Sequence, residues 1–132
     1  MVETHSGGCL CGAVRYVVQG PAINVRVCHC RLCQRAIGAT FNARALFAIS
    51  EVTMTGPVGT AHSSEGLKRG FCTQCGTTLF SMRESLGVMG LTLGGLDEPD
   101  RFSLTDHIWV ASKQAWLKLD DGLPQYDQGP PA

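Results

Sequence analysis

The sequence has no excess of positive charge, no long apolar run and no internal repeat. Its 11 lysines and arginines balance 11 aspartates and glutamates, so it lacks the basic surface that steers proteins to phosphate backbones. The longest weakly polar stretch, residues 86–96, contains four glycines and is far shorter than the roughly 20 residues that span a bilayer. The first ten residues have no basic segment followed by an apolar one, as a secretory signal would. These absences predict a cytoplasmic protein that binds neither nucleic acid nor membrane.

The composition is that of an ordinary globular protein. Hydrophobic residues make up 44% of the 132 positions and charged residues 17%, which excludes a disordered or fibrous chain. A chain of this length has room for one hydrophobic core. We therefore expect a single domain over residues 1–132.

Short apolar runs punctuated by glycine and proline predict a mostly β fold with short antiparallel strands. Residues 13–18 and 23–27 flank Gly20-Pro21, and this pattern predicts a hairpin. Residues 31–37 predict a short helix that ends at Gly38. Further strands are expected at residues 41–47, 52–55, 77–82 and 88–93.

Three aromatic positions near the carboxyl end have less specific patterns. His107 adjoins apolar residues and is expected to be a hydrogen-bonded structural histidine. Trp109 and Trp116 are expected in the core, with the wall of a ligand pocket as the alternative.

Seven cysteines are many for so short a chain, and an odd number cannot all form intramolecular disulfides. Their spacing is also tight, and in a reducing compartment such thiols are available as zinc ligands. The chain therefore predicts zinc binding through cysteine thiolates. The three motifs are Cys9-x-Cys11, Cys28-x-Cys30-x-x-Cys33 and Cys72-x-x-Cys75.

Seven thiolates cannot fill two four-cysteine sites, so two zinc ions would leave one site open. The pairs Cys9, Cys11 and Cys72, Cys75 can together form a closed tetrahedral site, because an extended segment and a knuckle each present two sulfurs to one point. The trio Cys28, Cys30 and Cys33 lies within six residues and can hold a second ion with one position free. Spacing alone also permits Cys28 and Cys30 to join Cys72 and Cys75, or a single zinc with some cysteines buried as small apolar residues. His29 alternates away from its neighbours, so it is expected to point outward or to lie next to the ligands without touching the metal.

Four segments together closely resemble the glutathione-dependent formaldehyde-activating enzyme family, whose domain is shared with centromere protein V. The segments are GGCLCGAVRY, CHCRLCQRAIGATF, SSEGLKRGFCTQCGTTLF and HIWVASKQAWLKLDDGLPQY. The resemblance covers nearly the whole chain, from Gly8 to Tyr126. The resemblance implies a small β-tent-like zinc domain. It further implies that Cys9, Cys11, Cys72 and Cys75 hold a structural zinc, and that Cys28, Cys30 and Cys33 form the second site, associated with glutathione and catalysis.

The activity implied by this resemblance is that of a carbon-sulfur lyase, which forms S-hydroxymethylglutathione from formaldehyde and glutathione. Glutathione would be the co-substrate, two zinc ions the cofactors, and a small thiol or thiol adduct the partner. Its carboxylates need donors, and the basic residues nearest the cysteine motifs are Arg31, Arg35, Lys68 and Arg69. No catalytic acid, base or oligomeric state is assigned. The alternative is a noncatalytic zinc-binding interaction module; a DNA-associated module would need a basic region that the sequence lacks.

Overall fold

A computed structural model describes residues 3–130 of the chain, which form two β-sheets and one short α-helix. The smaller sheet has the order β1-β2-β5, and the larger has the order β10-β3-β4-β9-β8-β7-β6. The strands of the smaller sheet are β1 (Thr4–Gly8), β2 (Arg15–Gln19) and β5 (Val52–Thr55). Those of the larger are β3 (Asn24–Cys28), β4 (Asn42–Ala48), β6 (Val58–Ser64), β7 (Leu67–Cys72), β8 (Thr78–Arg83), β9 (Val88–Thr92) and β10 (Asp106–Ile108).

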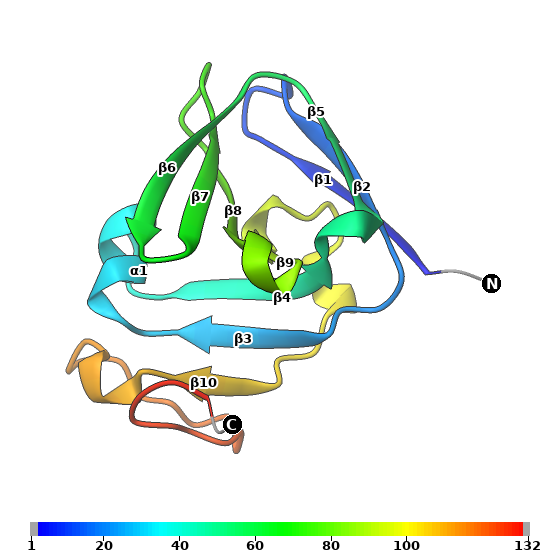
Figure 1. Cartoon of the computed structure of the whole chain (residues 1–132). Coiled ribbons are helices and arrows are strands. Elements are labelled where there is room, and N and C mark those ends of the chain that lie inside the picture. The colour runs from blue at the N-terminus through cyan, green and yellow to red at the C-terminus, as the bar shows by residue number, and fades with distance from the viewer. Residues whose placement is uncertain (1–2, 131–132) are drawn as a thin grey trace.

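The two sheets lean together at one end of the molecule. Figure 1 shows β6 and β7 rising on one side and β1, β2 and β5 on the other, above a base of β3, β4 and β10. Both sheets contribute to the same core, because its fully buried side chains come from each of them. These side chains include Val18 of β2, Phe47 of β4, Leu79 of β8 and Leu91 of β9. The predicted small, mostly β, single-domain fold is thereby confirmed.

Strand positions were predicted better than strand partners. The expected hairpin of residues 13–18 and 23–27 is wrong, because β2 pairs with β1 and β5 while β3 lies in the other sheet. In addition, β10 pairs with β3 in parallel, so the sheet is not purely antiparallel. Alternation identifies a half-buried strand, but the partner depends on which edges the rest of the fold leaves free.

The single α-helix, α1 (Arg31–Ile37), has the predicted limits. The Cys30 side chain caps its first turn by accepting a hydrogen bond from the Cys33 backbone N–H. It ends at Gly38, whose φ of 65° is a left-handed conformation that glycine adopts at little cost. None of the helices among residues 3–130 is long and apolar enough to cross a membrane.

The expected burial of both tryptophans is wrong. The exposed fraction is 37% for Trp109 and 66% for Trp116. The core is already closed by residues of the two sheets, and both tryptophans lie in the irregular segment after β10. Trp109 instead lines a cavity, in agreement with the alternative prediction that it forms the wall of a pocket.

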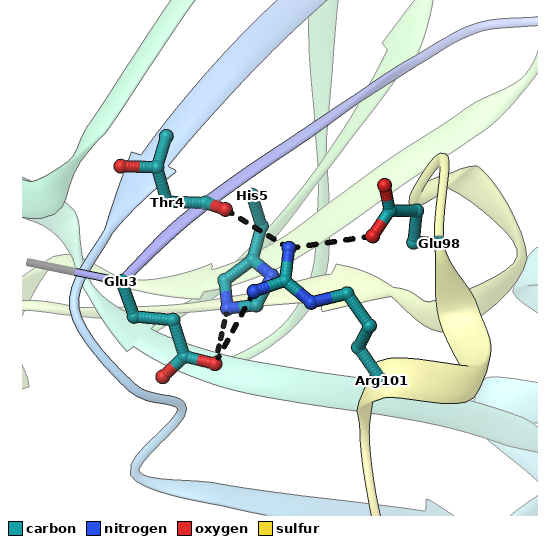
Figure 2. Close-up of polar contacts among 5 residues, drawn as sticks. All are labelled: Glu3, Thr4, His5, Glu98 and Arg101. Carbon is teal, nitrogen blue, oxygen red and sulfur yellow. Dashed lines mark hydrogen bonds and ion pairs between the residues drawn. The ribbon is translucent and has the colours of Figure 1, made fainter.

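The amino-terminal edge is fastened by Arg101, from the 3-10 turn η4 (Pro99–Arg101). Figure 2 shows its guanidinium donating to the Thr4 carbonyl, at 3.2 Å, and to Glu98, at 3.4 Å. The Glu3 carboxylate lies 3.8 Å from the Arg101 guanidinium and 3.1 Å from Nε2 of the buried His5. The contact with His5 does not have the geometry of a hydrogen bond. These contacts join β1 to the turn before β10.

Candidate metal centre and active site

The two outer cysteine pairs meet where the two sheets adjoin. Cys9 and Cys11 lie in the turn between β1 and β2, whereas Cys72 ends β7 and Cys75 follows it. Their four Sγ atoms all lie within 4.8 Å of one another. Two Sγ distances are 3.6 Å, from Cys9 to Cys11, and 3.8 Å, from Cys11 to Cys72. Four sulfurs at about 2.3 Å from a tetrahedral zinc would be about 3.8 Å apart, so this donor set fits the ion.

Hydrogen bonds to Cys9 and Cys75 favour the thiolate forms of these two side chains. The backbone N–H of Val14 donates to Cys9 Sγ at 3.2 Å, and that of Cys75 donates to Cys72 Sγ at 3.4 Å. Hydrogen bonds from the Thr77 side chain and backbone lower the pKa of Cys75 to about 5. The knuckle closes at Gly76, whose φ is 81°.

The central trio forms a second group at the junction of β3 and α1. Cys28 ends β3, Cys30 caps the helix and Cys33 lies in its first turn. The three Sγ atoms lie within 4.8 Å of one another, and among residues 3–130 no fourth cysteine, histidine or carboxylate joins them. Hydrogen bonds from Cys28 and Arg69 lower the pKa of Cys33 to about 5. The same contact between the two thiols raises the pKa of Cys28. The trio can therefore supply three of the four ligands of a zinc ion.

A cavity of about 590 Å³ opens beside the trio and is rich in arginine. In the described part of the chain, five arginines line it, and none of the lining residues is an aspartate, glutamate or histidine. Such a wall suits an anionic ligand, because guanidinium groups bind carboxylates in pairs of hydrogen bonds. The arginines are Arg26, Arg31, Arg44, Arg69 and Arg83.

Two of these arginines are held close to the sulfurs. Arg69 is buried and donates from Nη2 to Cys33 Sγ, at 3.5 Å, and from Nε to Ser63 Oγ, at 2.9 Å. Arg44 has a buried Nη1 with no hydrogen-bond partner among the described residues. Burial lowers the pKa of Arg44, whereas the nearby Cys28 raises it. Since a guanidinium stays charged in proteins, Arg44 has an unused donor beside the trio.

The four basic residues predicted from the sequence have different positions. Arg31 and Arg69 line the cavity. Arg35 lines a separate surface depression, and Lys68 forms an ion pair with Glu84 at 2.6 Å. Lys68 is not among the residues that line the cavity.

Sequence reasoning missed three cavity arginines, Arg26, Arg44 and Arg83. Arg26 and Arg44 are directly opposite each other on β3 and β4. In each strand the arginine is next to buried residues that point to the opposite face of the sheet. This alternation could have been seen in the sequence, but only the pairing of β3 with β4 places the two arginines together on one face. Like charges opposite each other are unfavourable, and Arg26 is compensated by Asp106, whose Oδ1 lies 3.0 Å from Arg26 Nε.

A chain of polar groups begins at His29, between Cys28 and Cys30 in the sequence, and runs through the buried His107 to the exposed Asp121. His29 is fully buried, and its Nε2 lies 3.0 Å from Nδ1 of His107. Nε2 of His107 lies 2.7 Å from Asp121 Oδ2. With His107 neutral, it donates to Asp121 and accepts from His29. Burial and the neighbouring His107 and Lys113 lower the pKa of His29 to about 4. The cysteine group does not include His29, which is buried rather than pointing outward. His107 is hydrogen-bonded, as expected.

Known proteins are similar to this chain in sequence or in fold. The family model described as glutathione-dependent formaldehyde-activating enzyme matches residues 4–112. An uncharacterized lyase of Schizosaccharomyces pombe is 32% identical over 78 residues, which are 58% of this chain and 56% of that protein. The chain thus aligns with little more than half the length of this relative. A crystal structure of a Rhodobacter sphaeroides protein is similar with a TM-score of 0.59 and 23% identity, over 75% of this chain and 96% of that one.

Proposed function

The chain belongs to the glutathione-dependent formaldehyde-activating enzyme family, and from that premise we propose that it is a zinc-dependent carbon-sulfur lyase acting on a glutathione adduct. The reaction would join formaldehyde and glutathione reversibly to give S-hydroxymethylglutathione. A cytoplasmic location, where thiols stay reduced, suits both substrate and ligands. The lyase name of the Schizosaccharomyces pombe relative supports the reaction class.

Two zinc ions would have different roles. Cys9, Cys11, Cys72 and Cys75 would hold a structural ion, and Cys28, Cys30 and Cys33 an ion with one open position. When bound at the trio, zinc would lower the pKa of an added thiol and favour its thiolate form. Three cysteine thiolates would already outweigh the charge of the ion, so activation of the thiol is more suitable than polarisation of the carbonyl.

The arginines would hold glutathione in the cavity. Arg69 and Arg44 flank the trio, and Arg31 lies on the helix that begins there, so carboxylates of the bound tripeptide would find donors around its sulfur. Arg35 and Lys68, which do not line the cavity, have no part in this proposal. The positive wall also favours entry of an anion into a partly desolvated space.

Formation of the carbon-sulfur bond requires a net transfer of one proton from the thiol to the carbonyl oxygen. The sulfur of glutathione bonds to the carbonyl carbon, the π electrons move to oxygen, and the oxygen takes up a proton equivalent to that lost by the thiol. The free Nη1 donor of Arg44 can stabilise the negative oxygen before protonation. We assign no general base, because no histidine or carboxylate lines the cavity among residues 3–130.

The observation that carries the proposal is the cysteine trio in the wall of an arginine-lined cavity. Exchange spectroscopy of ¹³C-formaldehyde with glutathione, which measures interconversion at equilibrium, tests it. Zinc-loaded protein should accelerate exchange above the uncatalysed rate, and Cys30→Ser should abolish the acceleration. An unchanged exchange rate with fully zinc-loaded protein would exclude the reaction with formaldehyde.

Within residues 3–130 the cavity lining has no histidine or carboxylate, and this favours one alternative, a noncatalytic zinc-binding interaction module. Such a module has no reason to bind glutathione. Glutathione binding by calorimetry therefore separates the two functions before any rate is measured, and absence of binding would leave the module as the better interpretation.

A further inference from the structure

The exposed part of the cavity lining, called the mouth below, combines apolar side chains with two arginines, Arg31 and Arg83. Among the described residues, three large hydrophobic side chains combine high exposure with a place in the cavity lining: Leu32, Leu86 and Trp109. Their exposed fractions are 51%, 70% and 37%. They come from α1, from the 3-10 turn η2 (Glu84–Leu86) and from the segment after β10. Exposed apolar side chains that line one cavity from separate elements mark a binding surface.

The backbone of Trp109 is in a conformation that bulky residues rarely adopt. Its φ and ψ are 57° and 38°, and it is the one non-glycine residue with positive φ among residues 3–130. Backbone hydrogen bonds hold it there, because its N–H donates to the Gln128 carbonyl at 2.8 Å and its carbonyl accepts from Ser112 at 3.0 Å. Glycine or asparagine would adopt this conformation at lower cost. Strain of this kind is found at functional sites, and here it fixes an indole at the cavity mouth.

Formaldehyde does not account for this apolar surface. A hydroxymethyl group on sulfur has one carbon and a hydroxyl, so it would leave the mouth without an apolar partner. Leu46, Leu67 and Val88 add to the apolar lining of the cavity. The register of β3 with β4 places the Arg26–Arg44 pair between Leu46 and Cys28. A hydrocarbon group attached to the reacting carbon would therefore reach this lining past the two arginines while the sulfur remained at the cysteines.

We propose that the preferred substrates are hemithioacetals whose reacting carbon bears an apolar alkyl or aryl group, the adducts of a thiol with aldehydes larger than formaldehyde. This inference rests on the proposed lyase function and narrows its substrate class. The chemistry is unchanged. In the cleavage direction the carbon-sulfur bond breaks, its electron pair stays on sulfur, the hydroxyl proton leaves, and the aldehyde carbonyl re-forms.

Thioether analogues of glutathione test this inference without turnover. S-methylglutathione and S-hexylglutathione both lack an ionisable thiol, so they differ only in hydrocarbon length. A fully buried methylene tightens binding about fourfold, and even half of that free energy over the added methylenes exceeds tenfold. Calorimetry with zinc-loaded protein should therefore give at least tenfold tighter binding of the hexyl analogue. Equal affinities would overturn the inference.

Variants at the mouth locate the effect. Leu86→Ser and Trp109→Asn should each reduce the preference for the hexyl analogue at least threefold, and asparagine keeps the left-handed backbone accessible. The matched controls are Ile23→Ser and Trp116→Asn, at exposed positions outside the cavity lining. These should retain the wild-type preference. A loss equally large in the controls would show that the hydrocarbon binds elsewhere, and would overturn the inference.

The inference and the proposed function fail in different ways. Acceleration of formaldehyde exchange without any preference for the hexyl analogue would retain the lyase and overturn the apolar substrate class. A hexyl preference that depends on Trp109 and Leu86, but without exchange of formaldehyde or of hexanal adducts, would overturn the lyase and with it the assignment of these groups as substrates.

Discussion

Loss of one ligand should affect the two cysteine groups very differently, and Cys11→Ser compared with Cys30→Ser is the sharpest test. The four-cysteine group joins the turn after β1, in one sheet, to the knuckle after β7, in the other. Cys11 is exposed, so its replacement removes a ligand without opening a cavity in the core. Cys30 belongs to a group confined to six consecutive residues, and serine there would still cap α1.

The expected magnitudes differ accordingly. Structural zinc in small peptides contributes an apparent binding free energy of about 10 to 16 kcal/mol. If four ligands share it evenly, losing one costs about 3 to 4 kcal/mol, which is a large part of the total stability of about 5 to 15 kcal/mol. At about 3 to 5 °C per kcal/mol for a domain of this size, Cys11→Ser should lower the melting temperature by at least about 10 °C. Cys30→Ser should lower it by less than about 5 °C.

Thermal melts followed by circular dichroism, with the zinc content of each variant measured in parallel, check this. Wild-type protein treated with a strong chelator is the control and should be at least as unstable as Cys11→Ser. The reasoning would be refuted if Cys30→Ser unfolded as readily as Cys11→Ser, or if Cys11→Ser retained both its zinc and its melting temperature.

Three further outcomes are expected. Metal analysis of protein purified without chelator should give two zinc ions per chain; a constant value of one, with the central thiols freely titratable, would contradict the two-site arrangement. Glutathione should bind with release of protons at neutral pH, since coordination requires the thiolate, and more tightly than S-methylglutathione; equal affinities would show that sulfur does not reach the metal. Gly70→Ala should destabilise the fold by about 1 to 3 kcal/mol, because a Cβ there overlaps the buried Phe80 ring. Gly94→Ala, with open space around it, is the matched control in urea unfolding.

Interactions between near neighbours in the sequence were predictable from the sequence. The helix over residues 31–37 ends where Gly38 permits a left-handed turn, and its first turn is capped by Cys30. The strand positions follow from alternation, which depends only on consecutive residues. The tight spacing of the cysteine trio likewise determines that its sulfurs can meet, because a strand end and one helical turn give few other arrangements.

Contacts between distant residues needed the tertiary structure. Spacing left open which cysteine pairs share a site, and the sheets bring Cys9 and Cys11 to Cys72 and Cys75. No local pattern places Arg44 opposite Arg26, or His107 against His29 from 78 positions away. The exposed, left-handed Trp109 is a similar case, because aromatic character alone predicts burial. Local sequence determines conformation within a few residues, whereas the side chains that share a cavity depend on strand order and register, and these are fixed only when all the elements compete for the same edges and core.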